Sequence, residues 1–294
     1  MTQPEVTPGL VVVDKPSGWT SHDVVGRGRR LAGTRKVGHA GTLDPMATGV
    51  LLLGIGRATR LLGQLQLTDK AYDATIRLGQ ATVTEDAEGE VVSTTPASHL
   101  SAEQIERALE PLRGEISQVP SAVSAIKVDG QRAYARVRAG EDVRLAARPV
   151  RVSELSVRAV RPAGGLVDVD VHVECSTGTY VRALARDLGE SLGVGGHLTM
   201  LRRTRVGPFT LEHAATLEDL AQDWQVIGLD TVTRLAFASY DLTQEQADDV
   251  RFGRTLTSID LGAPGPVALF DPVGTFLALY EQRGATARPV SVFV

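Results

Sequence analysis

One glycine-rich segment carries the side chains best placed to do chemistry. It reads Lys36-Val37-Gly38-His39-Ala40-Gly41-Thr42-Leu43-Asp44-Pro45-Met46-Ala47-Thr48-Gly49-Val50-Leu51. A carboxylate (Asp44) and an imidazole (His39) share a loop whose glycines permit close approach of a ligand backbone. Such a carboxylate can act as a nucleophile or base, or it can simply form a turn or cap a helix. The segment is not a phosphate-binding P-loop, because no lysine and hydroxyl follow its second glycine.

Other chemistries fit the remaining residues less well. Cys175 is the only cysteine, which excludes an internal disulfide and a multi-cysteine metal site. A thiol nucleophile would need a histidine such as His172 or His197. In an alternating strand, however, odd spacing puts Cys175 and His172 on opposite faces, and a free cysteine is commonly a small core residue. Because His, Asp and Glu show no ligand spacing such as H-E-x-x-H, we expect no metal site.

The elements around this segment can be predicted from their patterns. An apolar strand over residues 9–14 ends in a Lys-Pro-Ser-Gly turn, and Thr20 or Ser21 then caps a helix reaching Leu31. We expect residues 33–49 to form a loop, followed by a strand over 50–54 and a helical segment over 58–67. Residues 70–78 alternate as a strand does, and residues 84–89 predict an acidic turn.

The second half of the chain mixes both kinds of element. Ser101 and Gln104 have capping-box spacing and predict a helix to about Leu112. Period-two segments predict strands over 150–160 and 166–175, whereas 133–139 and 180–192 favour helices, the latter capped within 176–179. Without a regular βαβ alternation, this order predicts an α+β fold around a central mixed, largely antiparallel sheet.

A domain boundary is predicted near residues 234–239. Beyond it the chain changes to short strands separated by glycine and proline, over 266–270, 275–280 and 289–294. We therefore expect two domains, residues 1–235 and residues 236–294, the second small and β-rich.

Composition is that of an ordinary globular protein, with 43% hydrophobic and 22% charged residues among 294. No apolar run approaches the roughly 18 residues of a membrane helix, and no secretory signal is visible, so we expect a cytoplasmic protein without membrane association.

The net charge of −4 hides an uneven distribution. From Lys15 to Arg60 there are eight basic residues and two acidic ones. From Lys127 to Arg161 there are nine basic residues and four acidic ones. Beyond Thr210, twelve acids oppose five arginines. This asymmetry is typical of a basic binding face on an otherwise acidic protein. The alternative is that the arginines are ordinary solvent-exposed residues that pair with nearby carboxylates.

The Asp44 segment closely resembles the G-H-x-G-x-L-D-P-x-A-x-G-V-L signature of the TruB family of tRNA pseudouridine-55 synthases. Further matches to that family follow in order over about 190 residues. They are Val13-Asp14-Lys15-Pro16-Ser17-Gly18, Lys70-Ala71-Tyr72 with Arg77-Leu78-Gly79, Pro120-Ser121-Ala122-Val123-Ser124-Ala125-Ile126-Lys127, Cys175-Ser176-Thr177-Gly178-Thr179-Tyr180-Val181-Arg182 and Leu201-Arg202-Arg203.

The resemblance implies an isomerase that breaks the glycosidic bond of uridine 55 in the tRNA T-loop, turns the base and rejoins it through carbon. Asp44 would attack the base or the sugar, or remove a ribose proton. Arg182 would keep Asp44 ionised. Tyr72 would stack on the flipped base and is a candidate for moving the proton at the ring carbon, while Tyr180 would shape the base pocket. No redox change occurs, so no cofactor is expected.

The resemblance also implies RNA contacts. His39 would occupy or support the space left by the extruded nucleotide. Lys15, Lys127, Arg202 and Arg203 are candidate phosphate contacts, with Leu201 in the same motif as the last two. The segment 124–148 is expected to clasp the RNA. The implied partner is the tRNA T stem-loop, with no protein partner, and the chain is expected to be monomeric.

The last sixty residues resemble, more loosely, a PUA-like RNA-binding module. In this sequence the segment is acidic, so two roles stay open for it: binding RNA, or a mainly structural role. Two other functions stay open. One is a non-catalytic RNA-binding protein or RNA-folding chaperone. The chaperone role does not exclude catalysis, because a synthase can also assist RNA folding. The other is a synthase directed to a different RNA by a guide.

Overall fold

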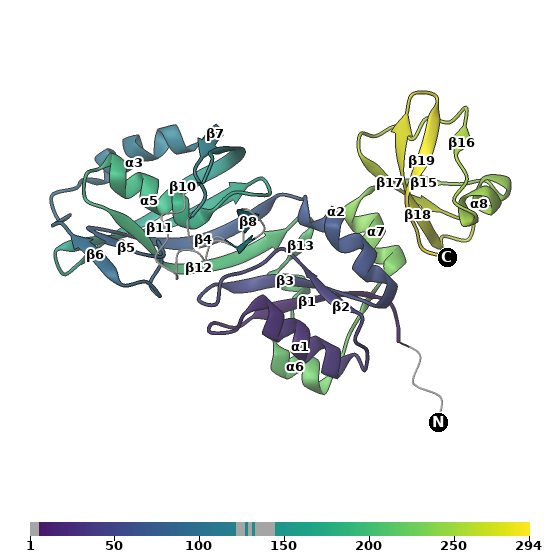
Figure 1. Cartoon of the computed structure of the whole chain (residues 1–294), viewed down its shortest axis with the longest axis horizontal. Helices are drawn as coiled ribbons and strands as arrows, with labels where there is room; N and C mark the ends of the chain where they lie inside the picture. Colours follow the sequence, from purple (N-terminus) through teal and green to yellow (C-terminus); the bar gives the residue numbers. More distant parts are fainter. Residues whose placement is uncertain (1–5, 122–126, 129–130, 133–144) are drawn as a thin grey trace.

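The computed structural model describes residues 6–121, 127–128, 131–132 and 145–294 (Figure 1). The helix predicted over 133–139 and most of the RNA clasp predicted over 124–148 lie outside these residues. Lys127 belongs to β8 (Lys127–Val128), which pairs with β9 (Gln131–Arg132), and its predicted phosphate contact also lies outside what is described.

A large sheet forms the body of the molecule, in the order β14-β1-β3-β12-β4-β11-β10-β7, with β2 beside β3 and β13 beside β12. Of its described strand pairs, only β3–β12 is parallel. The predicted α+β class with a mixed, largely antiparallel sheet is therefore confirmed. Its strands are β1 (Gly9–Lys15), β2 (Val37–Ala40), β3 (Thr48–Ile55), β4 (Lys70–Leu78), β7 (Gly114–Gln118), β10 (Arg148–Ala163), β11 (Leu166–Cys175), β12 (Gly196–Val206), β13 (Phe209–Thr210) and β14 (Ile227–Gly228).

Helices cover the two halves of this sheet separately. Figure 1 shows α3 and α5 together over the β4–β11–β10 half, and α1 with α6 beside β1 and β3. None of the helices in the described ranges has the length and apolar character needed to cross a membrane. The helices are α1 (Ser21–Leu31), η1 (Gly56–Leu61), α2 (Leu62–Gln66), α3 (Ala102–Leu109), η2 (Glu110–Leu112), α5 (Val181–Ser191), η3 (Leu211–His213), α6 (Leu217–Gln222), α7 (Leu229–Ala236) and α8 (Gln244–Arg251).

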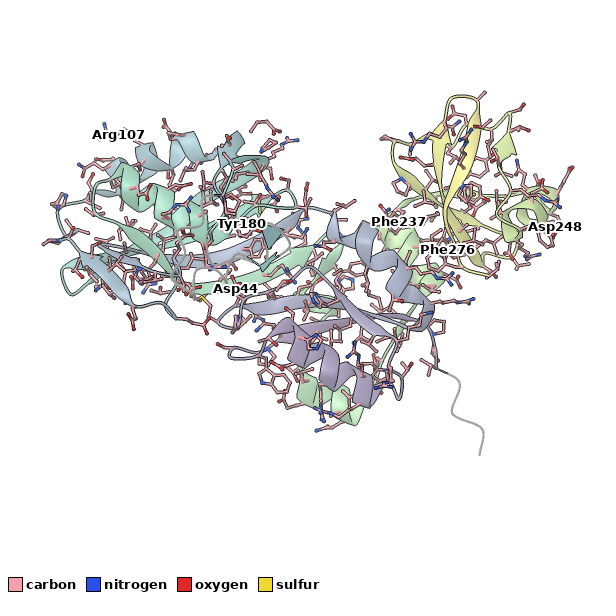
Figure 2. The ribbon with its side chains drawn as sticks, in the orientation of Figure 1. Asp44, Arg107, Tyr180, Phe237, Asp248 and Phe276 are labelled. Atoms are coloured by element: carbon pink, nitrogen blue, oxygen red, sulfur yellow. The ribbon has the colours of Figure 1, made fainter. Side chains whose placement is uncertain are left out.

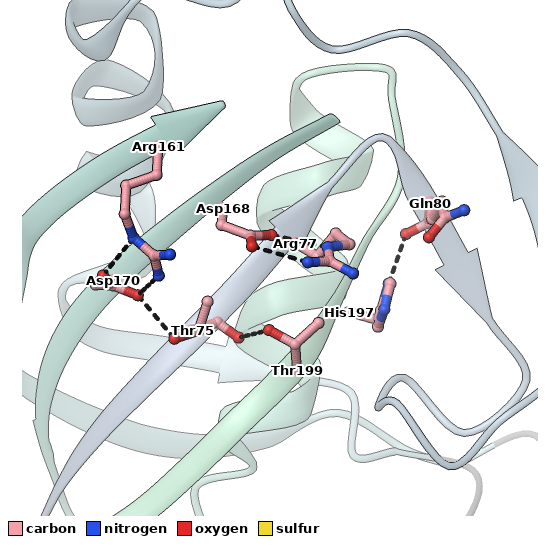
Figure 3. A network of polar contacts seen from close by, with 8 residues as sticks. All are labelled: Thr75, Arg77, Gln80, Arg161, Asp168, Asp170, His197 and Thr199. Atoms are coloured by element: carbon pink, nitrogen blue, oxygen red, sulfur yellow. Dashed lines mark hydrogen bonds and ion pairs between the residues drawn. The ribbon is translucent and has the colours of Figure 1, made fainter. Parts of the chain in front are cut away.

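The alternation of apolar and polar residues predicted for β11 determines which face of the strand is buried. Its four valines at positions 167, 169, 171 and 173 all lie in the main core. The residues between them face away from that core and form ion pairs with neighbouring strands (Figure 3). Arg77 makes two 2.8 Å bonds to Asp168, and Asp170 binds both Arg161 and the Thr75 hydroxyl. A slip of one residue would bury these charges, so the pattern specifies the strand register.

Two local predictions need correction. Residues 33–49 are not all loop, because Val37–Ala40 forms β2 on the edge of β3 and buries Val37 and Ala40. Only a tertiary partner could reveal this strand. The residues 176–179 do not cap α5, whose N-cap is Tyr180 and whose start has no capping bond from that side chain. Of the two caps predicted for α1, Thr20 is the one used, through a capping box with Asp23.

The C-terminal part forms a second sheet, in the order β15-β17-β18-β19-β16. Its first strand, β15, begins two residues after the end of α7. The division into domains predicted after residue 235 falls in the last turn of α7 and stays a prediction. The strands are β15 (Ala238–Asp241), β16 (Leu256–Thr257), β17 (Pro266–Phe270), β18 (Phe276–Arg283) and β19 (Thr286–Val292); a small hairpin of β5 (Gln80–Thr82) and β6 (Val91–Thr94) lies in the first part.

The second sheet is docked on the first part through a shared apolar cluster. Phe270, Phe276 and Phe293 are buried together with Leu61 and Phe209. Hydrogen bonds from η1 lie beside this cluster. The Arg57 guanidinium donates to the Phe293 carbonyl, and the Arg60 guanidinium donates to the Val292 carbonyl. The small domain is thus packed against the large one and is not merely tethered to it.

Candidate active site

The loop bearing Asp44 is anchored on both sides of the carboxylate. The buried Ser21 hydroxyl accepts a 2.9 Å bond from the Leu43 amide and donates to the Leu43 carbonyl at 3.1 Å. On the other side, the Pro45 carbonyl accepts from the Gly18 amide at 2.9 Å. Helix α1 and the turn before it therefore hold the backbone of Asp44 in place.

Two basic residues predicted to contact phosphate are instead buried around this loop. Lys15 is 0% exposed, and its Nζ donates to the carbonyls of Pro16 and Pro45. Burial lowers the pKa of Lys15 to about 8, against the opposing effect of the Asp44 charge. Arg203 is 1% exposed and donates to the carbonyls of Gly41, Thr42 and Val50. The phosphate contacts predicted for both are wrong, because the two side chains are buried away from solvent and donate to backbone carbonyls that brace the loop.

Asp44 forms a two-point ion pair with Arg182. The Arg182 Nε lies 3.0 Å from one Asp44 oxygen, and Nη2 lies 3.3 Å from the other. The same guanidinium donates from Nη1 to the Thr84 carbonyl at 2.8 Å and lies 3.5 Å from an Asp86 oxygen. The side chains of Arg182 and Asp86 are 6% and 4% exposed, whereas that of Asp44 is 35% exposed. One cation therefore sits between an open carboxylate and a buried one.

Burial shapes the acidity of Asp44. It raises the pKa of Asp44 above the ordinary 3.8, and the Asp86 charge acts in the same direction, while Arg182 opposes both. Once ionised, such a carboxylate is a stronger base than one in water, because it binds a proton more tightly.

A cavity of about 330 Å³ opens beside this ion pair. Its volume lies within the range of roughly 300–1,000 Å³ that small-molecule sites occupy. It brings together six of the residues predicted from the sequence, which are Asp44, Tyr72, Tyr180, Arg182, Leu201 and Arg203. Gly41, Thr42, Leu43, Gln66, Lys70, Thr177, Gly178, Thr179 and Val181 complete the lining.

The two tyrosines enter the cavity from rigid elements. Tyr72 lies on β4 and is nearly buried; burial raises its pKa, so its phenol is neutral at physiological pH, although a hydrogen bond from Arg203 opposes the shift. Tyr180 precedes α5, and the Gln118 side chain holds both its amide (2.8 Å) and its carbonyl (3.1 Å). Asp44 and Tyr180 lie close together where the two halves of the large sheet meet (Figure 2). Aromatic rings on a fixed backbone are suited to stacking on a base.

Two further predicted RNA contacts, His39 and Arg202, lie outside the cavity lining, as Lys15 does. His39 is on β2; burial lowers its pKa, and its Nδ1 has no hydrogen-bond partner in the described ranges. Arg202 is half-buried and makes a two-point ion pair with Asp14, at 3.1 and 2.7 Å. Its charge is thus already balanced within the protein.

Sequence patterns missed the residues that support the site. Asp86 was predicted only as part of an acidic turn, Gln118 carried no signal, and Ser21 was noted only as a possible helix cap. Glu85 was also missed; its backbone has φ of 62°, and its carboxylate pairs with Arg186 at 2.8 Å. A positive φ is unfavourable for glutamate, so this ion pair helps to hold the turn that presents Asp86 to Arg182.

The alternatives of thiol and metal chemistry can now be located. Cys175 is buried, and burial raises its pKa to about 11, so the thiol stays protonated. Glu154, His172 and Glu174 place three possible ligand atoms within 4.8 Å of one another, a grouping that no sequence spacing predicted. It lies on the opposite sheet face from Tyr72 and so cannot act together with Asp44.

Comparison with known protein families gives matches over most of the chain, including the segments that form the cavity. Three family models match in succession: "TruB family pseudouridylate synthase (N terminal domain)" over residues 29–181, "tRNA pseudouridylate synthase B C-terminal domain" over 182–231 and "tRNA Pseudouridine synthase II, C terminal" over 237–294. A chain in a solved Cbf5-Nop10-Gar1 complex is 25% identical with a TM-score of 0.73, covering 100% of this chain and 91% of that one.

Curated relatives named tRNA pseudouridine synthase B are much closer in sequence. The protein of Arthrobacter sp. (strain FB24) is 59% identical, over 97% of this chain and 96% of its own length. That of Thermobifida fusca (strain YX) is 57% identical, over 97% and 98%. These similarities and the three matched models show that the chain belongs to the TruB family of pseudouridylate synthases.

Proposed function

We propose that this protein converts uridine 55 in the T-loop of tRNA to pseudouridine, with Asp44 as the catalytic carboxylate. The observation that carries the proposal is the Asp44–Arg182 ion pair at a cavity lined by two tyrosines. The names of the close relatives and the matched TruB signature supply the reaction and the substrate.

The chemistry requires the base to leave and return. The bond from N1 of uracil to C1′ of ribose breaks, the base turns, and C5 bonds to C1′. C5 then loses its proton and N1 gains one, so the product is an isomer and no electrons are exchanged with a cofactor. Asp44 acts as a nucleophile on the base or the sugar, or as the base that takes a ribose proton, and all of these roles require the ionised form.

Each lining residue has a proposed part in this reaction. Arg182 holds the Asp44 carboxylate in the charged form against the effect of burial. Tyr72 stacks on the detached uracil, and its phenol exchanges the proton at C5. Tyr180 and Leu201 bound the base pocket, and Arg203 and Lys15 brace the loop from beneath. His39 supports the RNA where the nucleotide has left it. Lys127 contacts an RNA phosphate, and Arg202 does so at the edge of its ion pair with Asp14.

The substrate uridine must be flipped out of the T-loop to reach Asp44, because a stacked base cannot enter a cavity of this kind. We further propose that the protein acts as a monomer in the cytoplasm and needs neither a metal nor a cofactor. One chain supplies the carboxylate, its cation and both aromatic rings.

The test is pseudouridine formation at position 55 of an unmodified tRNA transcript. Asp44→Asn keeps the shape and removes the charge, so RNA binding should persist while turnover falls by several orders of magnitude. Asp73→Asn is the matched control: it makes the same change on the outer face of β4, where Asp73 bonds His172 within the part of the chain that the structure describes, and should leave turnover unchanged. An active Asp44→Asn variant would rule out the assigned role.

Two further outcomes would redirect the proposal. If the wild-type protein binds tRNA and leaves uridine 55 unchanged, it is a binding protein or an RNA-folding chaperone. If unrelated stem-loops are modified as well as T-loop minihelices, the substrate is a broader class of RNA.

A further inference from the structure

A second hollow, of about 420 Å³, lies beside helix α1 and is separate from the Asp44 cavity in its lining. The residues that line it are Gly18, Trp19, His22, Asp23, Gly26 and Arg30. Residues 19, 22, 26 and 30 follow one another at steps of three or four, and residue 23 lies three before residue 26, so all five share one face of α1 and of the turn before it. We call this hollow the α1 groove.

The α1 groove begins where the Asp44 loop is anchored. The Gly18 amide donates to the Pro45 carbonyl at 2.9 Å, and the Ser17 hydroxyl donates to the Met46 carbonyl at 3.3 Å. Asp44 precedes Pro45 and Trp19 follows Gly18. With about 3.8 Å per residue step, the backbones of Asp44 and Trp19 are on the order of 10 Å apart. A ligand that places one nucleotide at Asp44 therefore has its neighbouring nucleotides within reach of the groove.

The side chains of the groove suit a nucleotide. Trp19 is 36% exposed, so its indole offers a face on which an unpaired base can stack. His22 and Arg30 are exposed, and Arg30 has no hydrogen-bond or ion-pair partner in the described part of the chain. The one acid, Asp23, is bound to the amide and hydroxyl of Thr20 in the capping box. Asp23 keeps its negative charge, but it lies seven residues from Arg30, roughly 10 Å along the helix. The Arg30 end of the groove is therefore the part that complements a phosphate.

Gly26 leaves the floor of the groove open. A glycine inside a helix costs about 1 kcal/mol relative to alanine. A Cβ added at Gly26 would meet nothing within 4 Å, whereas one at Gly28 would lie 2.9 Å from Leu53 Cδ1. Internal packing thus explains Gly28 and does not explain Gly26. The missing side chain clears the surface between Trp19 and Arg30 for the backbone of a ligand.

We propose that the α1 groove binds an unpaired nucleotide of the substrate RNA close to the extruded uridine. Its base stacks on Trp19, its sugar–phosphate backbone crosses Gly26, and its phosphate meets Arg30. The inference rests on the proposed function for the identity of the RNA, and it adds a contact that positions the loop while the target base is out of its stack.

The test uses the Asp44→Asn protein, so that RNA binds without turnover, and measures tRNA affinity by fluorescence anisotropy at several salt concentrations. Trp19→Ala and Gly26→Leu should each weaken binding about tenfold, through lost stacking and a filled floor. Arg30→Gln should reduce the salt dependence by about one phosphate contact. Arg29→Gln is the matched control, because Arg29 is on the same helix outside the groove and bonds the Val37 carbonyl.

A spectroscopic measurement locates the nucleotide. With 2-aminopurine beside the target position, its fluorescence should be quenched on binding and recover in Trp19→Ala. Thermal unfolding shows whether each variant is folded; Gly26→Leu should be at least as stable as the parent, since leucine favours a helix.

The outcomes separate this inference from the proposed function. If Trp19→Ala and Gly26→Leu bind RNA as tightly as Arg29→Gln, the groove is not an RNA site, whether or not wild type forms pseudouridine. If the variants bind weakly and wild type forms no pseudouridine, the RNA site stands and the proposed catalytic function is wrong.

Discussion

Arg182 divides its charge between two carboxylates that have different surroundings. Asp86 is buried and bound within its own turn, where Thr84 and the Glu88 amide also bond to it. Asp44 lies on the open side and borders the cavity. The buried partner keeps the guanidinium oriented, so the exposed partner can take part in bond changes while the cation stays in place.

This arrangement predicts how activity depends on pH. The pKa of Asp44 is raised, so activity should fall at a higher pH than an ordinary aspartate would give as acid protonates the carboxylate. Arg182→Gln removes the group that lowers this pKa. We expect a slower enzyme whose acidic limb of kcat/KM moves to still higher pH.

The measurement is a pH profile of kcat/KM for wild type, Arg182→Gln and Arg107→Gln. Arg107 lies on α3, far from Asp44 in Figure 2, and its substitution should leave the profile unchanged. An acidic limb that stays where it is in Arg182→Gln would contradict the electrostatic role assigned to the ion pair.

The Asp44 loop depends on the contact between β3 and β12 at its end. Gly49 pairs with Arg203 across these strands and has φ of 98°. A Cβ at Gly49 would lie 2.2 Å from the Arg203 carbonyl oxygen. The backbones of the two strands can therefore approach only because residue 49 has no side chain, and this approach also brings the Arg203 side chain under the loop.

Gly49→Ala should consequently lower the free energy of unfolding by roughly 2–5 kcal/mol, from backbone strain and overlap. Gly63→Ala is the control, because Gly63 is exposed in α2 and an added Cβ meets nothing within 4 Å. That change should raise the free energy of unfolding by about 0.5–1 kcal/mol. Denaturant titration measures both, and equal effects at the two positions would show that the close approach is unimportant.

Across the whole chain, the shared apolar cluster joins the two sheets. Alternate residues of β17 point to different cores: Val267 and Leu269 to the interior of the small domain, and Ala268 and Phe270 to the shared cluster. Phe276 and Phe293 pack against each other in this cluster, with ring centres 5.0 Å apart and ring planes tilted by 46°. Neither part can separate without exposing these rings to water.

We therefore expect a single cooperative unfolding transition that includes both sheets. Phe293→Ala should lower the free energy of unfolding by about 3–5 kcal/mol and should leave the transition single. Differential scanning calorimetry tests this by comparing calorimetric and van't Hoff enthalpies. Val273→Ala, at a highly exposed position of the same domain, is the control. Two resolved transitions in wild type would show that the domains are energetically independent.

The tertiary structure also shows which basic residues between Lys15 and Arg60 stabilise the fold and which are exposed and available to a ligand. Three of these charges serve the fold, since Lys15 is buried and the arginines at 57 and 60 bind the carbonyls of β19 and the residue after it. The exposed remainder lies on and after α1 and includes Arg30, Arg35 and Lys36. Counting charges along the chain could not distinguish these groups, because burial depends on what packs against each residue.

Local patterns were enough to predict much of this protein. The strand over 70–78, the capping box at Ser101 and the buried valines of β11 depend on neighbouring residues alone, and all were confirmed. The TruB signature around Asp44 was sufficient to predict the family. Such features are readable because capping and side-chain alternation act over a few residues.

Other features required the folded chain. Asp86 reaches Arg182 from a turn about a hundred residues away, Lys15 and Arg203 became braces of the loop, and residues 37–40 became a strand only beside β3. Each depends on a distant partner that supplies a charge, a carbonyl or a sheet edge. Sequence periodicity describes which face of an element is apolar, and only packing decides what that face meets. The signature was enough to predict the Asp44–Arg182 pair, whereas the residues that anchor the Asp44 loop and orient Arg182 could be found only in the folded chain.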